Sequence, residues 1–326
     1  MRIIETISDL QKVPNGCVLT IGNFDGVHIG HQKILRTARQ AADKRGTSVV
    51  MMTFEPHPLA VLHPERAPET LTPLPLKRQL LMGLNVDYRL IVRSSVEVLS
   101  LSAREFVKKF IIDGVKPCVV VEGEDFNFGA KREGNVKTLE QIAKEDGFEV
   151  LVVEEEKIAI PDGQTLRVSS TMIRYMLESG RVADAAMSLG RAYRLIGKVV
   201  KGRGVGKALG FATANMEKPD QLIPAEGVYA GFVRLADDVE GVCGNGEKLP
   251  AVFSIGRIKT FGDDHPLLIE AHLLVEGVGE LWGKFMAMDF IEYLRPQFKF
   301  ESKDDLIKQI VKDCEKAKNI LTGLTG

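Results

Sequence analysis

The chain has 326 residues, and its 43 lysines and arginines nearly balance its 44 aspartates and glutamates, which gives a formal net charge of −1. A length of this order suggests two domains or one large one. The balanced charge excludes a broad positive field for nucleic acid or anionic lipid. The N-terminus has no apolar signal core, and no stretch approaches the roughly 20 apolar residues of a membrane span. We expect a cytoplasmic protein that binds neither nucleic acid nor membranes, and the sequence carries no signal for its oligomeric state.

The four cysteines, Cys17, Cys118, Cys243 and Cys314, lie far apart and lack C-x-x-C spacing. Three of them fall within apolar strand or helix patterns, where reduced cysteine packs as a small hydrophobic residue. The sequence therefore predicts neither disulfides nor a zinc knuckle.

The first half of the chain alternates β-type apolar runs with helix-type segments. The runs are residues 48–54, 88–92, 117–121 and 150–153, and the helix-type segments include 103–112 and 136–143. This alternation predicts a parallel sheet covered by helices on both faces. Ligands of such sheets bind beyond the carboxyl ends of the strands. Three polar loops are expected there, at residues 22–31, 55–58 and 123–134.

Residues 22–31 read Gly-Asn-Phe-Asp-Gly-Val-His-Ile-Gly-His and follow the apolar run 17–21. Residues 32–42 then have apolar side chains at the spacing of one helix face. The glycine turn is therefore expected at a helix N-terminus, where main-chain N–H groups favour anions. An ordinary strand-to-helix turn would explain the glycines, but not His28 and His31 together. We interpret the turn as a phosphate site.

From about residue 191 the pattern changes to strand-like runs without intervening helices, at 193–200, 227–235, 251–255, 267–275 and 284–293. This predicts an antiparallel barrel or sandwich. A last helix is expected from Asp304, with an apolar stripe that packs on the barrel. Residues 237–248 read as an exposed hairpin connection. The domain boundary is expected near residues 180–190, which gives domains 1–185 and 186–326.

The densest glycine run, residues 201–215, follows a strand and contains Gly202, Gly204 and Gly206. It could be a flexible hairpin loop, but the oxygens of Thr213 and Asn215 also suit Mg²⁺ that is shared with nucleotide phosphates. In the run 267–275, Glu270 lies on one strand face with Leu268, His272 and Leu274. A carboxylate in so apolar a strand is costly unless it is used or paired. A salt-bridged glutamate at a sheet edge is the alternative.

The glycine turn resembles the first signature of the HxGH nucleotidyltransferases, and residues 168–174, Val-Ser-Ser-Thr-Met-Ile-Arg, resemble the second. Residues 53–58 and 123–129 carry the resemblance further. With them, the chain is similar nearly end to end to the bifunctional riboflavin kinase/FMN adenylyltransferases, or prokaryotic FAD synthetases. The resemblance implies a Rossmann-like α/β domain followed by an all-β flavokinase-like barrel with a terminal helix. It also implies riboflavin, FMN and ATP as substrates, Mg²⁺ as the metal, and FMN and FAD as product ligands.

Carried over residue by residue, the resemblance implies that His28, His31 and Arg174 are catalytic in adenylyl transfer. It implies nucleotide or flavin contacts for Gly22, Asn23, Phe24, Asp25, Gly30, Asp125, Ser169 and Thr171. Ser169 also precedes an apolar-periodic run, so it could act as a helix N-cap, a role compatible with phosphate binding. His57, between two prolines, reads as a rigid loop residue or as a third metal-binding histidine.

In the second half the resemblance makes Glu270 the base for the ribityl hydroxyl, Thr213 and Asn215 the metal ligands, and Gly202, Gly204, Gly206 and Arg295 ligand-binding residues. Several positions depart from the family pattern: Asn127 replaces arginine, Ala212 and Lys259 replace proline, Ser254 replaces asparagine, Gln297 replaces glutamate, and 275–276 replace Asp-Phe. The leading hypothesis is phosphorylation of riboflavin to FMN followed by adenylylation of FMN to FAD. The alternatives are a monofunctional adenylyltransferase with a degenerate, flavin-binding or regulatory barrel, and a flavin sensor or storage protein.

Overall fold

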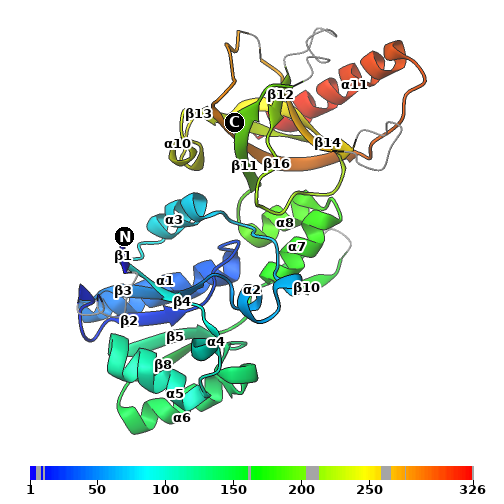
Figure 1. Ribbon diagram of the computed structural model, residues 1–326. Helices are drawn as coiled ribbons and strands as arrows, with labels where there is room; N and C mark the ends of the chain where they lie inside the picture. The colour runs from blue at the N-terminus through cyan, green and yellow to red at the C-terminus, as the bar shows by residue number, and fades with distance from the viewer. Residues whose placement is uncertain are drawn as a thin grey trace. The chain divides into compact units, whose positions relative to one another are not determined.

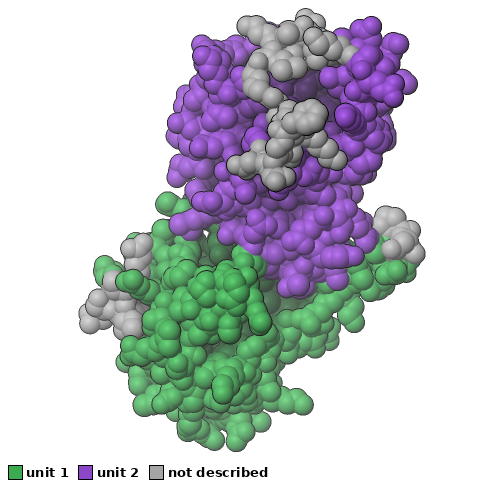
Figure 2. Space-filling view, turned by 45° about the vertical axis from the view of Figure 1, so that its right-hand side comes forward, with its two compact units in different colours: residues 1–68, 77–168 green, residues 69–76, 169–326 purple. Residues whose placement is uncertain are grey.

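The computed structural model describes residues 1–4, 9, 12–160, 163–202, 213–257, 266–275 and 277–324 (Figure 1). They form two compact units, coloured separately in Figure 2. Unit 1 is Met1–Pro68 with Lys77–Val168, and unit 2 is Glu69–Leu76 with Ser169–Gly326. Among the described residues no helix is both long enough and apolar enough to span a bilayer.

Unit 1 is built on a six-stranded parallel sheet with the order β1-β4-β3-β2-β5-β8. The strands are β1 (Arg2–Ile4), β2 (Val18–Ile21), β3 (Val49–Glu55), β4 (Tyr88–Arg93), β5 (Val119–Gly123) and β8 (Glu149–Val153). The predicted parallel sheet is confirmed. Because β2 is buried at every position, its sequence is nearly all apolar and does not alternate.

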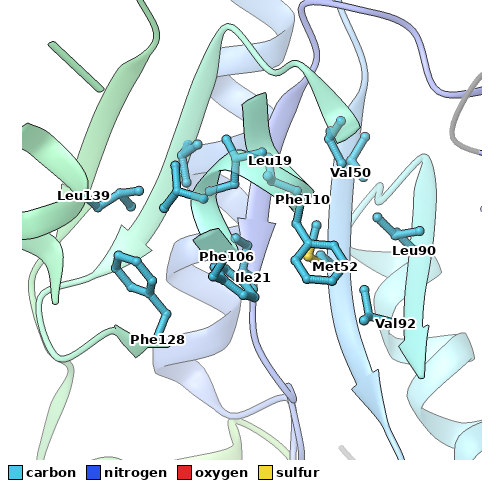
Figure 3. Close-up of a cluster of buried hydrophobic side chains, with 14 of the residues drawn as sticks. Leu19, Ile21, Val50, Met52, Leu90, Val92, Phe106, Phe110, Phe128 and Leu139 are labelled. Carbon is cyan, nitrogen blue, oxygen red and sulfur yellow. The ribbon is translucent and has the colours of Figure 1, made fainter. Parts of the chain in front are cut away.

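Helices cover both faces of this sheet, as predicted. On one face, α1 (Ile29–Arg45) packs its alanines against Val18, Val49 and Val119. On the other face lie α5 (Ala103–Phe106), the π-helical segment Val107–Val115 and α6 (Val136–Asp146). Figure 3 shows Phe106, Phe110, Phe128 and Leu139 pointing toward the apolar side chains of β2, β3 and β4.

Shorter elements complete unit 1 and place its loops. They are α2 (Pro58–Leu62), α4 (Val96–Leu99), β6 (Asn127–Phe128), β7 (Gly134–Asn135), β9 (Lys157–Ala159), β10 (Thr165–Arg167) and the 3-10 turns Pro64–Arg66 and Ala130–Arg132. Helix α3 (Leu74–Gly83) contributes the buried Leu81 to a cluster with Phe24, Leu35 and Met51. The glycine turn is thereby packed between α1, α3 and the sheet.

Unit 2 contains a closed antiparallel barrel with the order β11-β12-β15-β14-β13-β16. Its strands are β11 (Tyr193–Val200), β12 (Thr213–Met216), β13 (Gly227–Ala236), β14 (Leu249–Arg257), β15 (Leu267–Leu273) and β16 (Phe285–Arg295). Of the two predicted architectures, barrel or sandwich, the barrel is confirmed. Strand β12, at the end of the second glycine run, is an additional strand. The helices are α7 (Ser170–Glu178), α8 (Val182–Leu189), α10 (Val239–Cys243) and α11 (Lys303–Thr322).

The terminal helix packs on the barrel as its apolar stripe predicts. Cys314, Ala317 and Leu321 of α11 are buried in one cluster with Val228 of β13 and Val252 of β14. This cluster lies on the outer face of the barrel, because the alternate residue Phe253 packs edge-on against Phe290 in the interior.

Residues 237–248 connect the antiparallel strands β13 and β14 and are mostly exposed, as predicted, but the expectation that no helix interrupts the strand-like half is wrong. This stretch contains α10, and Val242 and Cys243 are buried. Arg194 donates from Nη1 to the carbonyl oxygens of Val242 and Cys243 at 3.1 and 2.9 Å. A high glycine content indicates local freedom of the backbone, but the arginine that binds this segment lies more than 40 residues away in the sequence.

Candidate active sites of the two units

The glycine turn between β2 and α1 has a strained backbone. Phe24 and Val27 have positive φ angles of 49° and 42°, and Gly26 has a φ of 85°. A β-branched residue such as valine rarely adopts this region. Phe24 and Val27 are 2% and 1% exposed, so burial of their side chains holds the turn in place. Backbone strain that the surrounding packing over-determines is typical of functional sites.

His28 and His31 lie together at the start of α1. Their rings stack with centroids 3.6 Å apart and planes inclined by 17°. His28 is the N-cap of the helix, and its Nδ1 accepts a hydrogen bond from the main-chain N–H of His31 at 3.3 Å. A Cβ at Gly30 would lie 3.3 Å from the His28 ring, so a glycine leaves room for this arrangement. Since Nδ1 accepts, Nε2 of neutral His28 carries the proton that can be donated to an anion.

Asn23 and Asp25 supply polar groups in the same turn. Asn23 Oδ1 is buried and accepts no hydrogen bond from the described residues. A buried polar atom without a protein partner is costly, and a bound ligand or water would satisfy it. Asp25 Oδ1 accepts from the N–H of Gly26 at 3.1 Å, and Gly22 extends the pairing with β3 by donating to Met52 O at 2.9 Å.

Asp125, in the loop after β5, is held by an arginine that the sequence reasoning missed. Arg167 of β10 forms ion pairs with Asp125 and, at 2.7 Å, with Glu155. The sequence signal for it was its position directly before residues 168–174. Asn127, which departs from the family pattern, donates to the main-chain oxygen of Asp125 at 2.6 Å. Its amide therefore stabilises its own loop.

A second missed group lies on the α3 side of the sheet. Arg89 of β4 is 1% exposed and forms an ion pair with Glu55 at the end of β3. Burial lowers the pKa of Lys77 on α3, and the neighbouring Asp25 and Glu55 carboxylates oppose that shift while Arg89 adds to it. These side chains form a charged cluster beside the glycine turn. An arginine within a strand pattern does not by itself indicate such a cluster, so the sequence contains no signal for it.

The second HxGH signature forms the start of α7. Ser169 is the N-cap, and its Oγ accepts from the N–H of Met172 at 3.2 Å, so the capping role considered above is confirmed. Thr171 is exposed in the first turn. Arg174 donates from Nε to the carbonyl oxygen of Glu69 at 2.8 Å. These three residues belong to unit 2, whereas His28 and His31 belong to unit 1.

His57 is the N-cap of α2, and its Nδ1 accepts from the N–H of Leu59 at 3.2 Å. No cluster of three histidine, cysteine, aspartate or glutamate side chains suited to a metal ion exists within the described part of the chain. The observed contact of His57 is thus a helix cap in the loop that follows β3.

In unit 2 the candidate kinase residues share one face of neighbouring strands. Asn215 of β12 lies opposite Glu270 of β15, and Thr213 lies opposite His272. Residues that pair directly across an antiparallel ladder have their side chains on the same face. Ile269, Ala271 and Leu273 alternate with them and are buried. Hydroxyl, amide and carboxylate oxygens thus gather on the outer face of the barrel.

Gly202 begins the second glycine run directly against these residues. A Cβ at position 202 would overlap the side-chain amide of Asn215, so a larger residue there would displace that amide. Gly204 and Gly206 lie outside the described residues, as do Ala212, Lys259 and Glu276 among the departures.

Arg295 is committed to a structural partner at the end of β16. Its Nη2 lies 2.8 Å from Oδ2 of the buried Asp313 on α11, and its Nε lies 3.1 and 3.0 Å from the two carboxylate oxygens. The guanidinium also lies 5.0 Å from the ring centre of Phe298. The pair attaches the end of β16 to the terminal helix.

Comparison with known proteins assigns a family to each half of the chain. Residues 10–172 match the FAD synthetase family model, and residues 189–321 match the riboflavin kinase model. The bifunctional riboflavin kinase/FMN adenylyltransferase of Escherichia coli K12 is 36% identical over 96% of this chain and 96% of its own length. The chain belongs to the bifunctional riboflavin kinase/FMN adenylyltransferase family.

Other members of this family are similarly related. The Haemophilus influenzae relative is 35% identical over 98% of both chains, and that of Listeria monocytogenes is 36% identical over 94% of this chain and 91% of its own. A solved Streptococcus pneumoniae structure, described as a macrolide-efflux protein, has a TM-score of 0.83 and 27% identity, and the match covers 98% of this chain and 99% of that one. The two-part fold is therefore shared over the whole length.

Proposed function

We propose that this chain phosphorylates riboflavin with ATP to give FMN, and then transfers the AMP moiety of a second ATP to FMN to give FAD and pyrophosphate. The proposal is supported by both family models and by relatives that carry both activities in their names over nearly the whole length. The observation that carries it is that each half has its own set of candidate site residues. The first half has a histidine pair at a helix N-terminus, and the second has oxygen donors beside a glycine run.

For adenylyl transfer, an oxygen of the FMN phosphate attacks the α-phosphorus of ATP while the bond to the β-phosphate oxygen breaks. The protein stabilises the charge that develops on the phosphate oxygens and does little covalent chemistry. His28 Nε2 and the first N–H groups of α1 are suited to this, because the stacked rings and the strained turn keep their positions fixed. Ser169, Thr171 and Arg174 are proposed as further phosphate ligands on the family resemblance.

For phosphoryl transfer, the ribityl hydroxyl oxygen attacks the γ-phosphorus of ATP and ADP leaves. Glu270 accepts the hydroxyl proton as general base. The oxygens of Thr213 and Asn215, which lie on the same face as Glu270, are hard donors of the kind that Mg²⁺ prefers. Bound Mg²⁺ would neutralise phosphate charge there, and Thr213 and Asn215 are the residues proposed to hold it. We assign adenylyl transfer to residues 1–185 and phosphorylation to residues 186–326.

Chromatography of the products from riboflavin, ATP and Mg²⁺ tests the proposal directly. FMN followed by FAD is the expected result. FAD formed only when FMN is supplied would instead indicate a monofunctional adenylyltransferase with a non-catalytic barrel. Flavin binding without either product would indicate a sensor or storage protein.

A further inference from the structure

Gln297, just after β16, is attached to two other strands of the barrel through one nitrogen. Its Nε2 donates to Ser254 Oγ at 3.0 Å and to the carbonyl oxygen of Ile255 at 3.1 Å, and it lies 3.4 Å from the carbonyl oxygen of Gly227. The side chain lies along Gly256, where a Cβ would come within 3.0 Å of Gln297 Cγ. Although Gln297 is exposed, its amide therefore links β14 and β13 to the segment after β16.

Ser254 connects this amide to the candidate kinase residues. It lies directly opposite Glu270 in the ladder between β14 and β15, and Glu270 lies opposite Asn215 in the next ladder. The side chains of Ser254, Glu270 and Asn215 thus form one row across three strands on the same face. The group that Gln297 binds is the immediate cross-strand neighbour of the proposed base.

Gln297 and Ser254 are also two of the positions at which the sequence departs from the family pattern, and the structure shows that they bind each other. In this chain the donor is the amide at 297 and the acceptor is the hydroxyl at 254. With the usual glutamate at 297 and asparagine at 254, the donor would be the amide at 254 and the acceptor the carboxylate at 297. The two departures together exchange donor and acceptor.

We infer that Gln297 and Ser254 act as one hydrogen-bonded pair that positions Glu270 for phosphorylation of riboflavin, so that the two departures compensate each other. This inference rests on the proposed kinase function. Arg295, held by Asp313, fixes the chain two residues earlier, and the amide of Gln297 fixes it again beside β14. The segment after β16 is thus attached both to α11 and to β14, the strand that pairs with the strand of Glu270.

A change at one position alone should break the pair. In Gln297→Glu a carboxylate would face the carbonyl oxygens of Ile255 and Gly227, and of the three groups that Gln297 now contacts only the Ser254 hydroxyl could donate to it. The side chain would turn toward solvent and release β14. In Ser254→Asn/Gln297→Glu the amide at 254 would donate to the carboxylate, so the link would form again in the opposite direction.

The test is a double-mutant cycle on the full chain, with Gln297→Glu, Ser254→Asn and the double variant. We expect Gln297→Glu to lower kcat for FMN formation by about tenfold, with KM for riboflavin and ATP within about threefold of the unmutated values, since misplacement of a reacting group acts mainly on turnover. The double variant should recover to within about threefold. Gln40→Glu, on the exposed face of α1, makes the same charge change far from the pair in sequence and should leave kcat unchanged.

FAD formation from supplied FMN serves as the internal measure of folded protein and should be equal in all variants. Losses in the double variant that equal the product of the single losses would overturn the inference, as would a change of less than twofold in Gln297→Glu. If the unmutated chain forms no FMN, the proposed kinase function fails and this inference fails with it. If Gln297→Glu does not fold, Gln297→Met, which removes the donor without adding charge, should show the same loss of kcat.

Discussion

The main-chain N–H of Ile21 donates to Glu122 Oε1 at 2.6 Å, so a side chain of β5 closes the end of β2. The backbone ladder between these strands pairs only Val18 with Val119 and Leu19 with Val120. Beyond it the strands separate, and the Glu122 carboxyl group takes the place of a main-chain acceptor. Because β3 and β5 flank β2 on opposite sides, this is the switch point of the sheet, where ligands of parallel sheets bind.

Glu122 should make stability depend on pH. Burial, and to a smaller extent the Asp125 charge, raise its carboxyl pKa well above the usual value of 4.5, against the opposing hydrogen bond from Ile21. The folded state therefore keeps a proton that the unfolded state releases once the pH exceeds that value, so stability falls as pH rises from there toward the raised pKa. Glu122→Gln keeps the acceptor oxygen and removes the ionisation.

We expect the free energy of unfolding of Glu122→Gln, relative to the unmutated chain, to increase as the pH is raised from about 5 to about 8. Urea unfolding across that range measures the difference. Parallel pH curves for the two proteins would show that Glu122 ionises equally in both states.

Replacement of His28 should abolish FAD formation while FMN formation from riboflavin persists, since the two reactions are assigned to different halves. His28→Ala also removes a helix N-cap, which typically costs about 1 kcal/mol. His28→Asn retains a side-chain acceptor for the N–H of His31 and serves as the matched variant. Both should lower the rate of FAD formation by about 100-fold or more, measured with supplied FMN.

A loss of both activities in folded His28→Asn would contradict the two-site assignment. A change of only a few-fold in FAD formation would make His28 a structural cap and nothing more.

The variant Glu270→Gln distinguishes two roles for Glu270, a catalytic base or a paired structural carboxylate in the strand. If Glu270 accepts the ribityl proton, the amide should keep riboflavin and ATP binding but lower FMN formation by roughly 100-fold or more. FAD synthesis from FMN should continue. Turnover and melting temperature are measured on one preparation. A lowered melting temperature with unchanged turnover per folded molecule would favour the structural alternative.

The ion-pair network of unit 2 should be important for stability. The Asp289 carboxylate accepts two hydrogen bonds from Arg194, at 2.6 and 2.8 Å, and lies 3.3 Å from Arg234. The side chains of Asp289, Arg194 and Arg234 are 7%, 12% and 6% exposed. Asp289→Asn would take this carboxylate away from the buried Arg234 and the largely buried Arg194. We expect a loss of about 3–5 kcal/mol in the free energy of unfolding, measured in denaturant.

Asp237→Asn provides the control, because its carboxylate is 92% exposed and lies 3.6 Å from Lys284. A surface pair of this kind contributes about 0–1 kcal/mol. Equal losses in the two variants would show that the Asp289 network is not specifically stabilising.

The barrel should depend on the helices that precede it. Val182, Ala185 and Leu189 of α8 are buried in unit 2, and Ala225 donates its N–H to Leu177 O of α7 at 2.9 Å. A fragment of residues 169–326 should therefore melt at a higher temperature than one of residues 186–326. Equal melting temperatures would show that α7 and α8 add nothing to the barrel.

The sequence alone determined the features that depend on near neighbours along the chain. The run 193–200 became β11 with the same bounds, and the alternation around Glu270 separated the buried Ile269, Ala271 and Leu273 from the outer face. The stacked His28 and His31 lie within one helical turn, so their spacing alone brought them together. Apolar periodicity and short spacings are local properties, so a short stretch of sequence is enough to reveal them.

Only the tertiary structure decided which distant groups meet. Glu122 lies 101 positions from Ile21, Arg167 lies 42 from Asp125, and Gln297 lies 43 from Ser254. The positive φ angles of Phe24 and Val27 likewise depend on burial, since neither residue type favours that region alone, and Phe24 packs against α1, α3 and the sheet. Side-chain hydrogen bonds of this kind leave no periodic signal, because they form only after the strands have brought both partners together.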